Sequence, residues 1–165
     1  MNSKNVAKVT LDKIDIKIIS LLQKDGRITK LELSDKVALS ATPCWERMKK
    51  LERNGIIKGY SAEIDIDKLI NYSMSRVEIT LKNYTTAKAA EFEKVVNSMP
   101  EIVECEAVLG HIDYILKVFS ADVEEYQKTI EQLLNSSKLD IEHRTLPISK
   151  TIKKLEHINI QDIIS

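Results

Sequence analysis

The first sixty residues place hydrophobic side chains at every third or fourth position, which is the spacing of amphipathic helices. The first predicted helix spans residues 11–26 and ends at an Asp-Gly pair. Its apolar stripe consists of Leu11, Ile14, Ile18, Leu21 and Leu22. A second, short helix begins at Thr29, which together with Glu32 has the spacing of a capping box, and it buries Leu33 and Val37.

A third helix is predicted over residues 40–54, with Ser40 as its N-cap and Asn54-Gly55 as its stop. Pro43 is tolerated because a first-turn N–H has no helical partner. The inward stripe is small and apolar, and comprises Ala41, Cys44, Met48 and Leu51. The outward stripe is polar and basic, and comprises Thr42, Glu46, Lys49 and Arg53, with Trp45 and Lys50 on the two borders.

Three helices with a tight turn between the last two are typical of a helix-turn-helix. The final helix of such a unit lies in the major groove of DNA. The alternative is a generic three-helix bundle with solvated charges. Charge distribution favours the DNA-binding interpretation. Residues 1–60 hold 10 Lys and 3 Arg against 7 Asp and Glu, whereas residues 61–165 hold 12 basic and 18 acidic side chains.

The rest of the chain has a different hydrophobic pattern. Alternating positions predict strands over 77–81, 103–107, 114–118 and 141–148, with helical stripes over 92–99 and 123–133 between them. The order β-α-β-β-α-β is the ferredoxin-like arrangement, so the predicted fold class is α+β. This arrangement leaves one sheet face without helices. We expect two copies to associate through that face and to bury Ile, Val and Leu from both.

The change of pattern predicts a helix-turn-helix domain over residues 1–60, a hinge over 61–74 and an αβ sandwich over 75–165. The composition, 43% apolar and 30% charged, is typical of a soluble globular protein. No apolar run has the length of a membrane span, and the first residues lack the apolar core of a signal peptide. We therefore expect a cytoplasmic protein.

The sequence shows no arrangement typical of catalysis or metal binding. Cys44 and Cys105 form no C-x-x-C pattern, and we expect both as reduced thiols in the core. The three histidines lack metal-ligand spacing with them. No nucleophile–base pair, P-loop or G-x-G-x-x-G is present, so we expect no enzyme, no metal and no cofactor.

Several motifs together resemble the Lrp/AsnC family of leucine-responsive, or feast/famine, transcriptional regulators. They are LQKDGR, ELS, LS-x-TPC-x-ER, LE-x-x-GII-x-GY and G-x-x-DY, spread between about Leu11 and Leu155. The resemblance implies a winged-type helix-turn-helix, a linker and an αβ sandwich called the RAM domain. It also implies a homodimer formed through the sheets, often assembled further to octamers. Double-stranded DNA is the implied partner, and an amino acid or related metabolite the implied effector.

The resemblance matches Thr42, Pro43, Glu46, Arg47, Lys49 and Arg53 to the family's recognition helix. Physical argument assigns Thr42, Trp45 and Glu46, near the helix N-terminus, to base edges or a thymine methyl. Basic side chains are assigned to phosphates, namely Arg27, Lys30, Lys49, Lys50 and Arg53. Ser40, at the start of the same helix, is also counted among the DNA-binding residues. Two alternatives stay open. Trp45 is either a determinant of sequence preference or a rim residue packed on the second helix. Arg47, nearer the apolar stripe, either contacts DNA with the rest of its helix or pairs with an acid inside the unit.

In the family, a G-[DN]-x-D-Y loop lines an amino-acid site at a subunit interface, and here it reads Gly110-His111-Ile112-Asp113-Tyr114. Gly110 permits a close backbone turn, and Asp113 is suited to an α-ammonium group. His111 replaces the usual acid or amide, which makes pH-dependent binding an expectation. Arg144 and Thr145 are candidates to complete the site from another protomer. The alternative is a structural β-turn with a capping Asp.

Two rival functions belong to other classes. One is an enzyme like the sirohaem decarboxylases, which resemble this family in both domains and use histidines. The basic outward stripe of the third helix counts against it. The other is a ligand-binding or assembly module whose helical domain does not touch DNA. The favoured interpretation is a sequence-specific DNA-binding transcriptional regulator that responds to a small metabolite.

Overall fold

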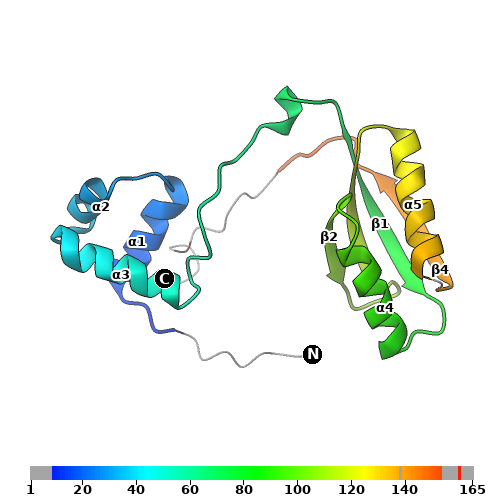
Figure 1. Ribbon diagram of the computed structural model, residues 1–165, viewed down its shortest axis with the longest axis horizontal. Coiled ribbons are helices and arrows are strands. Elements are labelled where there is room, and N and C mark those ends of the chain that lie inside the picture. Colours follow the sequence, from blue (N-terminus) through cyan, green and yellow to red (C-terminus); the bar gives the residue numbers. More distant parts are fainter. Residues whose placement is uncertain (1–8, 138, 154–159, 161–165) are drawn as a thin grey trace. The chain divides into compact units, whose positions relative to one another are not determined.

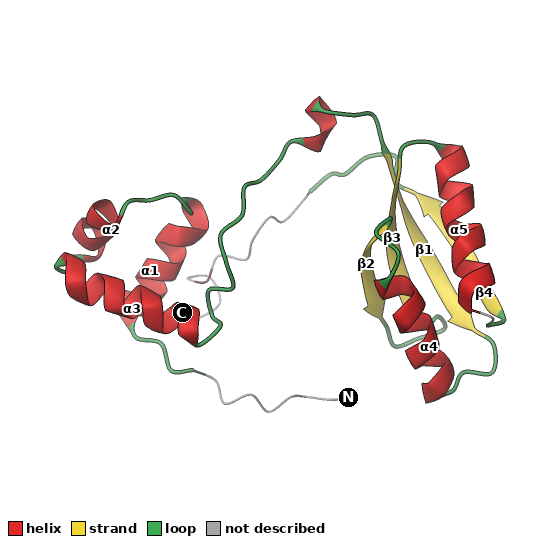
Figure 2. Ribbon diagram, in the orientation of Figure 1, coloured by secondary structure: helices red, strands yellow, loops and turns green. Residues whose placement is uncertain are grey.

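The computed structural model describes residues 9–137, 139–153 and 160, which belong to two compact units (Figure 1). The described part of the first unit is residues 9–63, 153 and 160, and the second unit is residues 64–152. Each unit has its own hydrophobic cluster. The α+β fold class predicted from the sequence is confirmed, with helices first and an antiparallel sheet second (Figure 2).

The first unit consists of three helices, α1 (Lys13–Lys24), α2 (Lys30–Val37) and α3 (Ala41–Arg53). Their shared core is the predicted set of inward stripes, in which the buried apolar residues are Ile18, Ile19, Leu33, Val37, Cys44 and Leu51. Asp12 begins α1 by accepting hydrogen bonds from the backbone N–H groups of Ile14 and Asp15. The predicted start of α2 is confirmed, because Thr29 and Glu32 form the reciprocal capping box.

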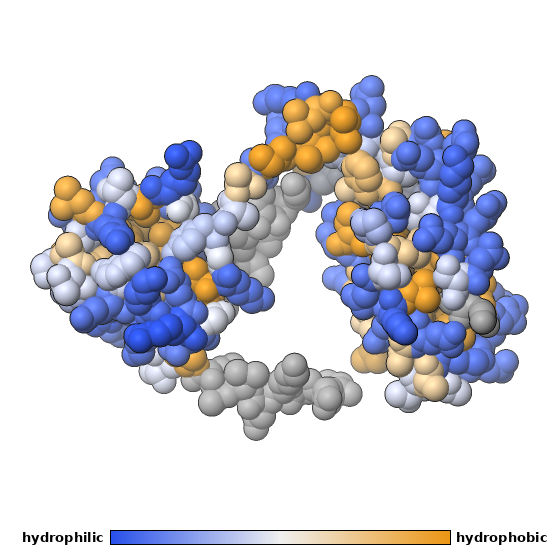
Figure 3. Space-filling model, viewed as in Figure 1, coloured by the Kyte–Doolittle hydropathy of each residue, from blue (hydrophilic) through white to orange (hydrophobic). Residues whose placement is uncertain are grey.

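The first residues of the second unit, before its first strand, include several exposed apolar side chains. They contain a short 3₁₀ turn, η1 (Ile66–Lys68), and Figure 3 shows apolar side chains gathered around it. Ile64, Leu69 and Ile70 are each about half exposed or more. The observed boundary between Glu63 and Ile64 falls inside the hinge expected over 61–74. Ile160, expected in the sandwich, instead packs against the helical cluster, and its N–H donates to Gln23 Oε1.

The second unit is a four-stranded antiparallel sheet with strand order β2-β3-β1-β4. Its elements are β1 (Ser73–Leu81), α4 (Thr86–Asn97), β2 (Ile102–Ala107), β3 (Tyr114–Ser120), α5 (Val123–Ser137) and β4 (Ile141–Pro147). Inward residues of β1 and β3 share one core with α4 and α5, which is centred on the fully buried Phe92, Leu116 and Leu133. The predicted β-α-β-β-α-β order is therefore confirmed.

The sheet face that packs against no helix differs from the expectation of an aliphatic surface. Charged side chains occupy its centre, where Glu104 lies 2.8 Å from Lys117 and 3.1 Å from Arg76. Apolar side chains on this face are few: Ile115 and Phe119 are half-buried, and Leu146, which pairs with Arg76, is 39% exposed. Strand alternation explains the difference, because the helix-covered core takes most of the aliphatic residues of β1 and β3.

Candidate functional site

The position of α3 is fixed by a three-residue turn after α2. Ala38 adopts the left-handed conformation, with φ 56°. The N–H of Ala38 donates to Asp35 O and that of Leu39 donates to Ser34 O, which satisfies the last carbonyls of α2. Ser40 then occupies the predicted N-cap position of α3, although its side chain makes no cap hydrogen bond. The tight turn predicted from the sequence is confirmed.

The two faces of α3 follow the predicted stripes, except that Ala41, expected on the inward stripe, is exposed at the start of the helix. Cys44 and Leu51 are 2% exposed, and Met48 packs against the same core. The opposite side chains of Thr42, Glu46, Lys49 and Arg53 are all exposed. A helix with 3.6 residues per turn that buries one stripe in this way must present the other outward.

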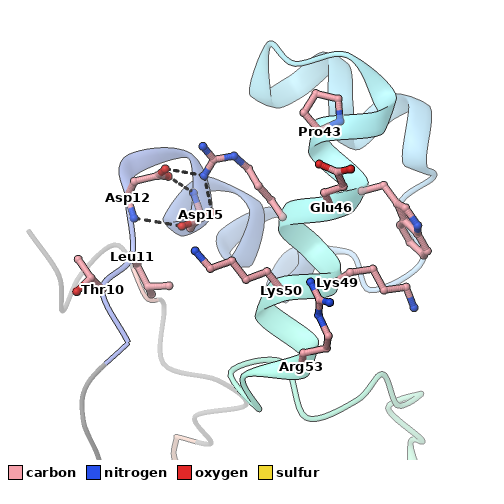
Figure 4. Close-up of a pocket in the computed structure, with 11 residues that line it drawn as sticks. Thr10, Leu11, Asp12, Asp15, Pro43, Glu46, Lys49, Lys50 and Arg53 are labelled. Carbon is pink, nitrogen blue, oxygen red and sulfur yellow. Dashed lines mark hydrogen bonds and ion pairs between the residues drawn. The ribbon is translucent and has the colours of Figure 1, made fainter.

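An open groove of about 840 Å³ lies between this outward face and the start of α1 (Figure 4). Its lining includes seven of the residues predicted to bind DNA, namely Pro43, Trp45, Glu46, Arg47, Lys49, Lys50 and Arg53. The four other predicted residues, Arg27, Lys30, Ser40 and Thr42, are exposed but do not line it. Three of the basic side chains, Lys49, Lys50 and Arg53, extend along one stretch of the helix, which suits a polyanion.

Arg47 forms an internal ion pair instead of pointing freely into the groove. Its guanidinium nitrogen lies 2.5 Å from Asp12 Oδ2 and 2.8 Å from Asp15 Oδ1, as the dashed lines of Figure 4 show. The backbone N–H of Asp15 and the Arg47 guanidinium hold the pKa of the Asp12 carboxyl below its usual value. Of the two alternatives for Arg47, the structure therefore shows pairing inside the unit. Its partners are the two acids of the capping box at the start of α1, which the sequence did not connect with Arg47.

Trp45 brings two lysines from different helices together. The ammonium nitrogen of Lys30, on α2, lies 3.5 Å from the centroid of the indole ring, and that of Lys49 lies 4.8 Å from it. Both distances are within the range of a cation–π interaction. The half-buried ring thus occupies the rim between α2 and α3, which sequence reasoning left open. No pattern in the sequence predicted that Lys30 and Lys49 would contact the same aromatic ring.

In the second unit, the loop from Gly110 to Tyr114 is largely committed to the fold. Asp113 Oδ2 accepts the N–H of Leu81 at 2.7 Å, and the N–H of Asp113 donates to Ile79 O. Tyr114 is 2% exposed, and its hydroxyl donates to Glu93 on α4. These contacts attach the loop to β1 and α4, and they favour the alternative of a structural turn with a capping Asp. Gly110, with φ 154°, and His111 remain exposed.

Arg144 and Thr145 are neighbours on β4, so they lie on opposite faces of the sheet. Arg144 lies on the helix-free face, 3.9 Å from Glu78, whereas the hydroxyl of Thr145 hydrogen-bonds to that of Tyr126 on α5. They cannot line one site within a protomer.

Three further expectations concern cysteines, metals and membranes. Cys44 is buried as predicted, but Cys105 is exposed, because β2 is an edge strand with little cover. In the described part of the chain, no group of His, Cys, Asp and Glu has the arrangement of a metal site. Within the same residues, no helix is both long and apolar enough to cross a membrane.

Comparison with known proteins agrees with this architecture. Residues 11–58 match the family described as winged helix-turn-helix DNA-binding, and residues 76–157 match the Lrp/AsnC ligand-binding domain. The transcriptional regulatory protein DoeX of Halomonas elongata is 38% identical over 154 residues, covering 93% of this chain and 98% of the relative. The leucine-responsive regulatory protein of Escherichia coli K12 is 37% identical, covering 98% of both chains.

Solved structures show the same arrangement. A transcriptional regulator from Neisseria meningitidis, crystallised as a complex with L-Met, superposes with a TM-score of 0.83 at 30% identity, covering 93% of this chain and 99% of that one. LrpC of Bacillus subtilis superposes with a TM-score of 0.73 at 32% identity, covering 89% of this chain and all of the other.

The fold and the comparisons thus define a transcriptional regulator with a helix-turn-helix DNA-binding domain and an Lrp/AsnC ligand-binding domain. The chain belongs to the Lrp/AsnC family. It is not an enzyme, and the relatives lend no support to the sirohaem-decarboxylase alternative.

The Arg47 ion pair leads to a stability prediction. Arg47→Met leaves the carboxylate of Asp15, whose side chain is 8% exposed, without its guanidinium partner. We expect the helical unit to lose about 1–3 kcal/mol of unfolding free energy, the usual cost of unpairing a partly buried charge. Urea unfolding at pH 7 measures it, followed by the fluorescence of Trp45, the single Trp of the chain.

The control measures the same Arg47→Met change in the Asp15→Asn background, by comparing Asp15→Asn with Arg47→Met/Asp15→Asn. With the carboxylate already neutral, removing Arg47 should cost much less. Equal losses from Arg47→Met in both backgrounds would show that the ion pair does not contribute.

Proposed function

We propose that α3 enters the major groove of DNA, with its first turns at base edges and its later basic residues at phosphates. The groove along the outward face of α3 carries this proposal, because it gathers Lys49, Lys50 and Arg53 on one accessible surface. Thr42 and Glu46 lie nearer the helix N-terminus, where recognition helices contact bases. A regulator acting in this way works in the cytoplasm, where its DNA is.

Trp45 is proposed as a positioning residue for the DNA backbone, acting through Lys30 and Lys49. The aromatic face attracts both ammonium groups and offsets part of their mutual repulsion. One ring thereby holds cations from α2 and α3 at neighbouring points, where successive phosphates of one strand run. Arg27 lies outside this cluster and is proposed as a peripheral phosphate contact.

The protein is proposed to act as a homodimer that forms through the helix-free face of the sheet. These dimers are proposed to assemble further to octamers. That face offers both acidic and basic groups, and Arg144 on it has a side chain that is 74% exposed. A two-fold axis brings a surface onto its own copy, so such a face pairs its acids with the other copy's bases. The interface is thus expected to be electrostatic as well as apolar.

The second unit is proposed to bind an amino acid or a related small metabolite that changes DNA binding. Support comes from the ligand-binding family that matches residues 76–157 and from the L-Met complex of the Neisseria regulator. Gly110 and His111 are the exposed part of the expected loop, and Arg144 or Thr145 of another protomer is proposed to approach it.

Lys49→Ala tests the phosphate role. Loss of one cation per protomer should weaken binding to every sequence and reduce the slope of log affinity against log salt by about 1 per protomer. Filter-binding titrations with a random-sequence 30-bp duplex at several salt concentrations measure it. Lys128→Ala, on α5, removes the same charge from the other unit and should leave the slope unchanged. An unchanged slope for Lys49→Ala contradicts the assignment.

Glu46→Ala tests base recognition. We expect the affinity ratio between a duplex selected from genomic fragments and the random-sequence duplex to fall by about tenfold, since one base contact contributes about 1–3 kcal/mol of discrimination. The salt slope should not decrease, because Glu46 carries no positive charge. A preserved ratio means that Glu46 does not contact bases.

Trp45→Leu tests the positioning role. It should weaken binding to the selected and random duplexes equally, by about two- to fivefold, because each exposed cation–π contact contributes about 0.5–1 kcal/mol. Trp45→Phe retains an aromatic face and should recover most of the affinity. A loss confined to the selected duplex would instead make Trp45 a base-reading residue.

Arg144→Glu tests the proposed dimer. The reversed charge should repel its copy across the two-fold axis and raise the dimer dissociation constant about tenfold or more, while the weak contact to Glu78 makes the cost to the fold small. Sedimentation equilibrium at low and high salt measures it. Lys128→Glu makes the same charge change on α5 and should leave the mass unchanged. Equal masses for both variants would exclude this face.

A further inference from the structure

The tyrosine of the Gly-Tyr motif, Tyr60, lies on the irregular segment that follows α3 and leads to the boundary between the two units. Its ring packs over Gly26, where an added Cβ would lie 3.7 Å from Tyr60 Cδ1. Its hydroxyl donates a hydrogen bond of 3.2 Å to Glu52 Oε1 on α3. Burial and the Glu52 carboxylate raise the pKa of Tyr60, so this hydroxyl remains a donor at neutral pH. Tyr60 thus attaches the segment after α3 to the helix itself.

The Glu52 carboxylate is shared between this hydroxyl and a lysine that is proposed to contact phosphate. Its second oxygen, Oε2, lies 3.4 Å from the ammonium nitrogen of Lys49, which is one turn earlier on α3. Close ammonium–carboxylate hydrogen bonds are shorter, at about 2.7–2.9 Å, so Lys49 is only loosely paired. Its side chain is 49% exposed, whereas that of Glu52 is 27% exposed. The carboxylate is therefore held by Tyr60, and the ammonium group remains accessible.

Lys49 has an aromatic neighbour on its other side, because the centroid of the Trp45 ring lies 4.8 Å from its ammonium nitrogen. The result is a connected row of side chains, namely Tyr60, Glu52, Lys49 and Trp45. Glu52 is the acidic member of this row. A carboxylate that paired closely with Lys49 would compete with a phosphate for the same ammonium group. What holds the carboxylate therefore affects how readily Lys49 reaches DNA.

We propose that Tyr60 is a positioning residue for DNA binding, which holds the Glu52 carboxylate and so leaves Lys49 available to a phosphate. Without the phenol hydroxyl, the carboxylate loses this partner and pairs more closely with Lys49. The lysine must then break a stronger ion pair before it contacts DNA. The inference rests on the proposed function, in which Lys49 lies at a phosphate.

Tyr60→Phe tests the inference, because it removes the hydroxyl and keeps the ring over Gly26. Affinity for the random-sequence duplex should fall about two- to fivefold, since an exposed ion pair is a modest interaction. The slope of log affinity against log salt should decrease, but by less than it does for Lys49→Ala. Filter-binding titrations measure both quantities. Tyr84→Phe removes the hydroxyl of a tyrosine in the second unit with similar exposure, 55% against 50%, and should bind as the unaltered protein does.

The same change in two other backgrounds shows whether Tyr60 acts through Glu52 and Lys49. In the Glu52→Gln background there is no carboxylate to compete for the lysine, so Tyr60→Phe should change the affinity little. In the Lys49→Ala background the lysine itself is absent, so the effect should again be small. A loss of the same size in either background, or no loss from Tyr60→Phe alone, overturns the proposal.

Thermal unfolding, followed by the fluorescence of Trp45, separates positioning from a structural role. Tyr60→Phe keeps the packing of the ring and removes one exposed hydrogen bond, so the melting temperature should fall by a few degrees at most. A larger fall, accompanied by equal weakening of DNA binding with Glu52 and with Gln at position 52, would show that the hydroxyl supports the fold. That outcome would count against the positioning role.

Lys49→Ala distinguishes failure of this inference from failure of the proposed function. If Lys49→Ala reduces the salt slope and Tyr60→Phe binds as the unaltered protein does, the DNA-binding surface stands and the role of Tyr60 is wrong. If neither variant changes binding, the phosphate contact of Lys49 and the inference that rests on it are both wrong.

Discussion

The packing of one side of α3 against α1 and α2 is the constraint on which the DNA-binding surface depends. Cys44 and Leu51 have almost no exposed area, and they lie two turns apart on the same stripe. Once they are buried, helical geometry leaves no choice for Glu46, Lys49 and Arg53, which must face outward. The left-handed Ala38 fixes the direction in which the chain enters this helix. The basic surface is therefore a consequence of apolar packing.

In the second unit, too, the burial of apolar residues decides which side chains face outward, but here side chains alternate between the two faces with a period of two residues. Alternation places aliphatic residues of β1 and β3 under the helices and leaves Arg76, Lys117 and Glu104 on the other face. The inward rows end in Ser75 and Ser120, which keep the period but not the size of the side chains. A cavity at that position is the expected result, because neighbouring side chains fill only part of the volume left by a missing aliphatic group.

Local signals explain how much of this was predictable from the sequence. The capping box of Thr29 and Glu32, the faces of α3 and the order of helices and strands along the chain depend on residues near one another in the sequence, and the sequence predicted each correctly. The partners of Arg47 lie more than thirty positions away, so no periodicity identifies them. Asp113 and Tyr114 were predicted as ligand contacts because of their motif, but Leu81 and Glu93, distant in sequence, hold them. The exposure of Cys105 could be predicted only with the knowledge that β2 is an edge strand.

Arg47 connects the stability of the helical unit to its electrostatics. The groove that gathers the basic residues of α3 also contains Asp12 and Asp15, two carboxylates that would repel a phosphate backbone. Arg47 lies between α3 and both of them and balances much of their charge while joining α1 to α3. Lys49, Lys50 and Arg53 then determine the sign of the surface that a duplex meets. In the proposed complex, Arg47 would thus favour DNA binding through its two partners, because it offsets one of the two negative charges of Asp12 and Asp15.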